Sequence, residues 1–185
     1  HILGATNNGS LNLTSSQPVR LIMSHATITN PKGAAISLNG KTTVAEMFLS
    51  AGTVNTLNDA STSSGNGALY AKANLTITGT GTLNVNGYKK HGIAVDAGLT
   101  IASGIINIAQ AASDGIHVDD YTQNGGTITI VPVGDGVDAG NTLTINGGDL
   151  SVNAASNDVK GIKSDGNVTI NDGIISLNVS GNQSK

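Results

Sequence analysis

Acidic residues gather in one short stretch of a weakly charged sequence. Segment 113–120, SDGIHVDD, holds Asp114, Asp119 and Asp120 together with His117. Carboxylates that lie close together repel each other unless a cation or a proton sits between them. Calcium is bound by about six to eight oxygen atoms, which aspartates, turn carbonyls and water supply. The residues alone favour a tight Asp-Gly turn, which aspartate readily forms, and a calcium site is the alternative interpretation.

Lysine and tyrosine side chains could serve a second chemistry, the binding of an anionic ligand. Lys160 and Lys163 follow the aspartates in the chain, and Tyr70 and Lys72 precede them. An ammonium group attracts a carboxylate, and a tyrosine ring offers an apolar face with a polar tip on which a sugar ring can stack. The alternative interpretation of the lysines is an ordinary solvated surface.

The same side chains raise the question of catalysis. A β-elimination needs a base, commonly Lys or Arg, whose pKa lies near the working pH. The single arginine, Arg20, lies far from the aspartates, which leaves Lys160 and Lys163 as candidates. We expect no catalytic residue, so a lyase is the less favoured alternative.

These residues belong to a repeat. Its units open at Ala68, Gly92, Gly115, Gly136 and Gly161, about 21 to 25 residues apart. Each unit has three short segments resembling GIxV, LTI and GTIxV, separated by Gly, Asn and Asp. Alternating apolar and polar residues predict strands with one buried face, and such units bury that face only by stacking. The repeat therefore predicts an all-β fold, a single-stranded right-handed parallel β-helix (solenoid) of about seven coils.

Equivalent positions of the units predict three buried rows of aliphatic side chains. The first row comprises Leu69, Ile93, Ile116, Val137 and Ile162. The second comprises Ile77, Ile101, Ile145 and Ile170. The third comprises Val85, Ile108, Ile130, Val152 and Leu177.

The same alignment predicts an outward row, because the residue after each first-row position points to the opposite face. This row comprises Tyr70, Ala94, His117, Asp138 and Lys163. The residues just before the opening positions are Gly67, His91, Asp114, Asp135 and Lys160. Asp114 and Asp135 are therefore expected about 5 Å apart on adjacent coils, where a cation would bridge them.

The alignment thus assigns candidate site residues. The predicted metal ligands are Asp114, Asp135, Asp138, Asp119, Asp120 and Asp165. The predicted carbohydrate-binding side chains are Lys163, Lys160, Tyr70, His117 and Lys72. For His117 the favoured interpretation is a surface histidine beside Asp119, rather than a ligand or base, and His25 and His91 have no evident acidic partner.

The composition excludes several classes of function. A net charge of −3 with only 9 Lys and Arg residues gives no basic stripe for duplex nucleic acid. Aromatic residues make up 2%, which leaves few stacking platforms for single strands. No apolar run is long enough for a membrane span. The absence of cysteine is consistent with a bacterial protein that is secreted or held at the cell surface.

The first third of the chain repeats less regularly. We expect one domain over residues 1–185, with looser coils in 1–58, a loop insertion in 59–67 and regular coils in 68–185. Stacked strands without a terminal cap leave unpaired edges. The domain is therefore expected to be truncated at one or both ends, or to self-associate end to end or edge to edge; the last coil ends at SGNQSK.

Two long segments and the recurring turns carry a resemblance to a known family. They are GAAISLNGKTTVAEMFLSAGTVNTLNDAS (33–61), GALYAKANLTITGTGTLNVNG (67–87) and the DGI and GIKS turns. The sequence resembles, over about residues 19–185, the secreted bacterial carbohydrate-binding domain-containing β-helix proteins first described in a cellulolytic clostridium. The resemblance implies a pectate-lyase-like right-handed β-helix, bound calcium, and binding of polygalacturonate and of cellulose, without lyase activity.

We therefore expect a secreted or cell-surface bacterial protein that binds plant cell-wall polysaccharide without cleaving it. Its expected partner is an acidic polysaccharide, polygalacturonate or pectin, with cellulose as a further one, and its expected cofactor is Ca²⁺, which the binding requires or which stabilises the fold. No nucleic acid and no membrane span are expected. The alternatives are a pectate-type lyase and a structural adhesin or surface solenoid without a glycan site.

Overall fold

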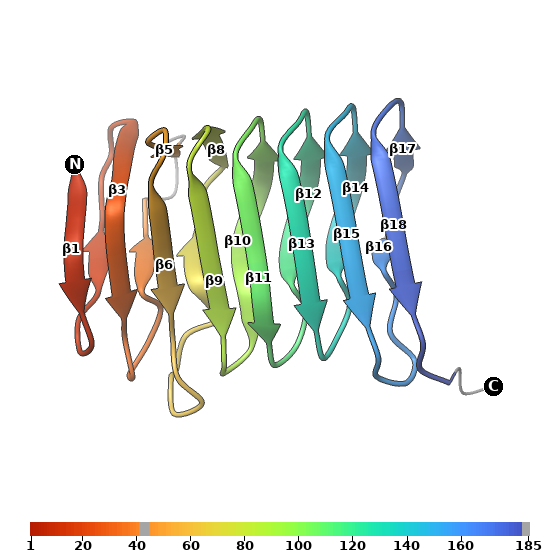
Figure 1. Cartoon of the computed structure of the whole chain (residues 1–185), viewed down its shortest axis with the longest axis horizontal. Coiled ribbons are helices and arrows are strands. Elements are labelled where there is room, and N and C mark those ends of the chain that lie inside the picture. The colour runs from red at the N-terminus through yellow and green to blue at the C-terminus, as the bar shows by residue number, and fades with distance from the viewer. Residues whose placement is uncertain (41–44, 183–185) are drawn as a thin grey trace.

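The computed structural model describes residues 1–40 and 45–182. The regular secondary structure of this part consists of β-strands alone. The strands pair in parallel and wind into a solenoid of about seven turns (Figure 1). This confirms the predicted parallel β-solenoid. The last residues of the terminal segment SGNQSK, 183–185, lie outside the described residues.

Short strands follow one another along the whole described chain. They are β1 (Ile2–Thr6), β2 (Leu11–Leu13), β3 (Val19–Thr29), β4 (Ile36–Leu38), β5 (Ala45–Leu49), β6 (Val54–Asn58), β7 (Gly67–Ala71), β8 (Leu75–Gly79), β9 (Thr82–Gly87), β10 (His91–Ile101), β11 (Ile105–Ala111), β12 (Ile116–Gln123), β13 (Thr127–Pro132), β14 (Val137–Ile145), β15 (Asp149–Ala154), β16 (Ile162–Ser164), β17 (Val168–Ile170) and β18 (Ile174–Val179).

Each turn of the solenoid contributes one segment to each of three faces. On the first face β4, β7, the first half of β10 and the first half of β12 pair in sequence. On the second face β8 pairs with the second half of β10, which bends between the two faces. On the third face β6, β9, β11, β13, β15 and β18 lie side by side, at the front of Figure 1.

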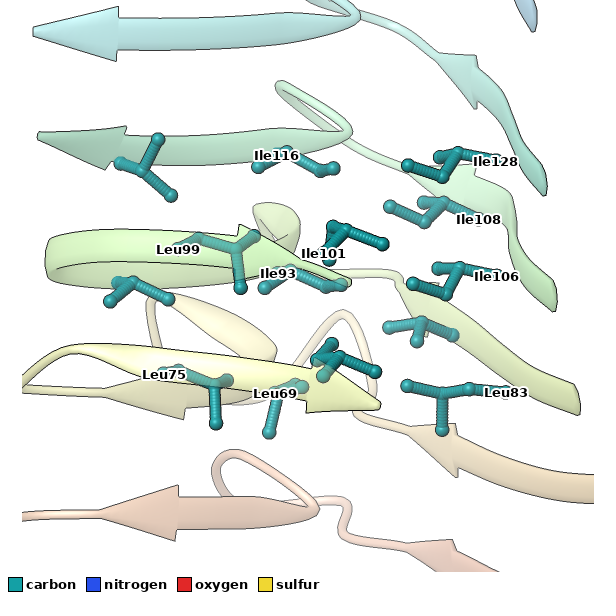
Figure 2. Close-up of a cluster of buried hydrophobic side chains, with 14 of the residues drawn as sticks. Leu69, Leu75, Leu83, Ile93, Leu99, Ile101, Ile106, Ile108, Ile116 and Ile128 are labelled. Carbon is teal, nitrogen blue, oxygen red and sulfur yellow. The ribbon is translucent and has the colours of Figure 1, made fainter. Parts of the chain in front are cut away.

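The buried rows have the predicted register. In the first row Leu69, Ile93, Ile116 and Val137 are Cα partners on successive coils, and all four are 0% exposed. Figure 2 shows Leu69, Ile93 and Ile116 of this row together with aliphatic side chains of the other faces, all pointing into the space between the faces. A coil has too little apolar surface to bury its own row, so stacking supplies the hydrophobic stabilisation. The last members of the second and third rows, Ile170 and Leu177, are an exception because they are exposed.

One rung of the core is polar, which the sequence pattern had not indicated. In the second row Gln123 lies between Ile101 and Ile145, and Tyr121 lies between Leu99 and Leu143. Tyr121 and Gln123 are both 0% exposed, so Tyr121 is not available to stack on a sugar. The Tyr121 hydroxyl donates to Oε1 of Gln123 at 3.1 Å, and Nε2 of Gln123 donates to the Asp149 carbonyl at 3.2 Å.

Asparagine side chains join neighbouring coils at turns and at the ends of strands. Asn171 donates to Asn146 at 2.7 Å, and Asn146 donates to Asn124 at 2.8 Å. Asn86 donates in the same way to Asn58 at 2.7 Å. Each amide offers both a donor and an acceptor, so a column of asparagines satisfies itself along the solenoid axis. These ladders hold the coils in register where no aliphatic row does.

The irregular connection 59–66 lies between β6 and β7 and projects at the lower edge of Figure 1. Its first residue, Asp59, is 1% exposed. Oδ1 of Asp59 accepts the backbone N–H groups of Tyr88 at 2.6 Å and of Lys89 at 3.3 Å. The inserted loop is thus fastened to the turn of the next coil by one buried carboxylate.

Replacing Asp59 with asparagine should change how stability depends on pH. Burial raises the pKa of Asp59 above 3.8, against the backbone hydrogen bonds from Tyr88 and Lys89, which lower it. Between pH 3.8 and the raised value the folded state binds more protons than the unfolded state, so this carboxyl makes stability fall as pH rises. Urea unfolding at pH 4 and pH 7 should show Asp59→Asn gaining stability relative to wild type at the higher pH.

Asp59→Ala serves as the control, because it removes the acceptor as well as the charge. It should lose about 1–3 kcal/mol at both pH values, since the two N–H groups are left without a partner. If the free energy of unfolding differed between wild type and Asp59→Asn by the same amount at both pH values, the raised pKa of Asp59 would be contradicted.

Candidate functional site

An outward-facing row runs along the first face of the solenoid. Tyr70, Ala94, His117, Asp138 and Lys163 are Cα partners in succession, as predicted. Pairing extends the row to Ser37 and Asn12 at its N-terminal end. Because the strands are parallel and in register, residues far apart in sequence form one continuous line.

The middle of this line carries an ionic cluster. Nδ1 of His117 lies 3.0 Å from Oδ2 of Asp138 and 3.5 Å from Oδ2 of Asp114. Nζ of Lys163 lies 2.8 Å from Oδ1 of Asp138 and 3.6 Å from Oδ1 of Asp165. The hydrogen bond to Asp138 raises the pKa of Lys163, which keeps this ammonium charged. Four of the predicted site residues, Asp114, Asp138, His117 and Lys163, are thus brought together.

His91 is a member of this cluster that sequence reasoning had left without an acidic partner. Its Nδ1 lies 3.2 Å from Oδ2 of Asp114, and its ring stacks on that of His117 with centroids 4.4 Å apart and planes at 10°. The signal was present in the repeat, because His91 and Asp114 occupy the same position of adjacent units. His117 correspondingly contacts Asp114 and Asp138, rather than the expected Asp119.

Asp114 and Asp135 both hold the turn of the next coil. Oδ1 of Asp114 accepts the N–H of Asp135 at 2.8 Å, and Oδ1 of Asp135 accepts the N–H of Lys160 at 2.7 Å. The structural role foreseen as the alternative interpretation therefore applies to both residues. Burial opposes ionisation of Asp114, but contact with His91 and the hydrogen bond from Asp135 outweigh it and lower its pKa.

The remaining predicted metal ligands lie outside the ionic cluster. Asp119 is exposed and has no hydrogen-bond or ion-pair partner among the described residues. Asp120 accepts a hydrogen bond from Oγ1 of Thr142 at 2.6 Å. Asp165 is well exposed and reaches only Lys163. The six predicted aspartates are therefore spread along the face rather than gathered around one point.

The predicted carbohydrate-binding residues divide between two places. Lys160 donates from Nζ to the Asp158 carbonyl at 2.7 Å. Tyr70 donates to Oδ2 of Asp96 at 2.5 Å, and burial together with this carboxylate raises the pKa of Tyr70 to about 12. Tyr70 is thus a neutral, half-buried ring in a fixed position.

A shallow polar groove of about 400 Å³ adjoins Tyr70. It crosses three successive coils at the N-terminal end of the outward row. Among the residues that line it are Asn12, Ser37, Asn39, Asn66, Tyr70 and Lys72. Asn39 and Asn12 are hydrogen bonded to each other across the coils. The groove thus offers amides, hydroxyls, one aromatic ring and one cation to a ligand that lies along the solenoid.

Comparison with known proteins assigns the family. Residues 1–185 match the model of the carbohydrate-binding domain-containing proteins. The chain belongs to this family. No curated protein sequence matches it.

The fold of this carbohydrate-binding domain protein is also found in a solved structure. It is similar to the polysaccharide lyase-like protein from C. thermocellum, a structure described as a gadolinium derivative. The TM-score is 0.78 at 23% sequence identity, over 99% of this chain and 83% of that one. At this identity the similarity concerns the fold alone.

The donor set of the ionic cluster is a poor fit for calcium. Calcium prefers oxygen ligands, whereas Asp114 and Asp138 face two imidazoles and an ammonium group. Among the described residues, the exposed carboxylate of Asp119 has no cation in contact, and that of Asp165 contacts only the Lys163 ammonium at 3.6 Å, so both offer calcium oxygen atoms without a histidine in contact. If the carbohydrate-binding domain uses calcium, these two residues are the ones that the donor chemistry favours.

Proposed function

We propose that the chain binds acidic plant cell-wall polysaccharide, polygalacturonate or pectin, and also cellulose, along the first face without cleaving it. The observation that carries the proposal is the polar groove at Tyr70 and Lys72, which is continuous with the outward row. An open groove across several coils suits an extended polymer better than a small sugar. The family description supports carbohydrate as the ligand class.

The charges of the groove and row support an acidic polymer. No hydrogen-bond or ion-pair partner of the Lys72 ammonium is found among the described residues, so a uronate carboxylate can pair with it. Lys163 and Lys160 stand farther along the same face. Surface attraction of this kind is screened by salt, so we expect binding of polygalacturonate to weaken as ionic strength rises.

The state of the basic residues supports binding without cleavage. A general base works best with a pKa near the operating pH, whereas the pKa of Lys163 is raised by Asp138. Nε of Arg20 is paired with Glu46 at 3.0 Å, and its guanidinium lies 4.7 Å from the Phe48 ring centroid. Neither residue is set up as a base for elimination.

We also propose that calcium assists the binding of polygalacturonate by joining polymer carboxylates to Asp119 and Asp165. Calcium would supply charge neutralisation between two acidic partners. The place of action that we propose is outside the cell, secreted or at the bacterial surface, where this polymer occurs. Among the described residues no helix has the length and apolarity that crossing a membrane requires.

Affinity electrophoresis and calorimetry with polygalacturonate test the proposed groove. Tyr70→Ala should weaken binding about 5- to 10-fold, the scale of a lost aromatic contact, and Lys72→Ala should weaken it at low salt. Tyr88→Ala and Lys89→Ala are matched controls, because both side chains are exposed on another turn. Unchanged binding by both groove variants, with the fold intact, would place the site elsewhere.

Metal removal tests the calcium proposal in the same experiments. EDTA should weaken binding of polygalacturonate, readdition of Ca²⁺ should restore it, and binding of cellulose should not change. Asp119→Asn combined with Asp165→Asn should remove the calcium effect. An absorbance rise from unsaturated products would identify a lyase instead, and no retention on either polymer would favour a structural solenoid.

A further inference from the structure

His91, Asp114 and His117 form a side-chain cluster whose chemistry differs from that of the glycan groove. One ligand atom from each lies within 4.8 Å of the other two, and among the described residues this is the only group of its kind. Both Nδ1 atoms approach the same oxygen, Oδ2 of Asp114, at 3.2 Å from His91 and 3.5 Å from His117.

The buried histidine is the observation that points to a ligand. His91 is 2% exposed, and neither of its ring nitrogens makes a hydrogen bond. Buried polar atoms in folded proteins nearly always have a partner, and one without a partner costs free energy. Its Nδ1 faces the carboxylate that it shares with His117. Among the described residues, Nδ1 has only this 3.2 Å contact, which does not form a hydrogen bond, so an ion bound between the two atoms would give the buried nitrogen a coordination bond.

We propose that His91, Asp114 and His117 bind a divalent transition-metal ion, with zinc as the type case. Two imidazole nitrogens and a carboxylate oxygen are ligands that zinc, cobalt, nickel and copper share, whereas calcium and magnesium prefer oxygen alone. Zinc bonds of about 2.0–2.2 Å separate tetrahedral ligand atoms by roughly 3.3–3.6 Å. The two contacts to Asp114 already have about that length.

The surroundings of the cluster fix two of the ligands and leave the third adjustable. Oδ1 of Asp114 is held by the N–H of Asp135, which leaves Oδ2 for the metal. The His91 side chain is 3% exposed and cannot move far, whereas that of His117 is 49% exposed. A tilt of the His117 ring out of the parallel stack directs both Nδ1 lone pairs at one point. Oδ2 of Asp138 lies 3.0 Å from the same His117 atom but is not part of the group within 4.8 Å, so water would complete the shell.

This site lies outside the proposed glycan groove, although on the same face. His91 is one coil and His117 two coils beyond the Tyr70 coil, and neither lines the groove. Metal binding can therefore be measured on the full chain with no glycan present, and the result does not depend on whether the groove binds polygalacturonate.

Titration of the EDTA-treated chain with Zn²⁺ by calorimetry, and with Co²⁺ by visible absorption, tests the proposal. We expect one ion per chain, a Co²⁺ spectrum of low coordination number, and no displacement by a large excess of Ca²⁺. His117→Ala should weaken Zn²⁺ binding by more than about 10-fold. It removes an exposed ring, so the fold should persist, and Asp114→Asn and His91→Gln should act in the same direction.

The chain offers matched controls, because it has 4 histidines and two lie outside the cluster. His1→Ser and His25→Asn should leave Zn²⁺ affinity unchanged; asparagine tolerates the left-handed backbone of His25, whose φ is 59°. Unchanged affinity in folded His117→Ala, affinity lost with His1→Ser, or equal competition by Ca²⁺ would overturn the proposal.

Discussion

Gly115→Val should destabilise the protein by about 3 kcal/mol or more, beyond the usual cost of overpacking a core. A Cβ atom at this position would come 2.1 Å from Cγ2 of Ile130 and 2.7 Å from the Gly136 carbonyl oxygen. The backbone cannot move away, because the N–H of Gly115 donates to Asp135 at 2.9 Å and its carbonyl accepts from Ile93 at 3.0 Å. The first and third faces thus meet here with room for hydrogen only.

Urea unfolding followed by circular dichroism measures this effect. Gly140→Ala is the control, since the nearest atom to its added Cβ lies 3.8 Å away, in ordinary contact. It should change stability by less than about 1 kcal/mol, or raise it by restricting the unfolded chain. Equal destabilisation by Gly115→Val and Gly140→Ala would show that close approach of the faces does not explain the repeated glycine.

Tyr121→Ala should cost about 3–5 kcal/mol, the range for removing a large buried aromatic side chain. Tyr121 is fully buried in a row whose neighbours are Leu99 and Leu143. The truncation leaves a cavity, and it also takes the hydroxyl away from Gln123. The loss should appear in urea unfolding as a lower midpoint with an unchanged slope.

Further substitutions distinguish the loss of the Tyr121–Gln123 hydrogen bond from the loss of side-chain volume. Gln123→Leu alone leaves the buried hydroxyl without an acceptor and the Asp149 carbonyl without its donor, at a cost of about 1–3 kcal/mol. Adding Tyr121→Phe to Gln123→Leu removes the orphaned hydroxyl, so the double variant should be more stable than Gln123→Leu. If the double variant lost as much stability as Gln123→Leu and Tyr121→Phe lose in sum, the two side chains would not be energetically coupled.

The sequence predicted the fold because aligning the repeat units shows which residues of successive coils pair. Ile93, Ile116 and Val137 recur beside small opening residues, and alternation fixes which neighbours point outward. The pairing of His117 with Asp138 across coils followed from that alignment. Row membership was therefore readable without coordinates, and so was the outward line from Tyr70 to Lys163.

Side-chain contacts between rows were harder to predict. His91 contacts Asp114, which holds the same repeat position on the next coil, but the burial of His91 and the packing of its ring on His117 appear only in the structure. Tyr121 and Gln123 were missed for a different reason, because YTQ replaces the LTI of other units and reads as a polar turn. Aligning YTQ with LTI would have placed both side chains in the core. The groove beside Tyr70 depends in part on the irregular residues 30–35 and 64–66, for which the repeat gives no rule.

Pairing between coils joins each coil to its immediate neighbours, and this makes the molecule extensible. A gene duplication of residues 115–135 would insert a coil whose rows continue those on both sides, since Ile116 already pairs with Ile93 and with Val137. The first face would lengthen by one strand spacing, about 4.8 Å, and the groove at its far end would keep its shape. The face that would lie along a polymer can thus be lengthened one coil at a time, while the existing groove stays unchanged.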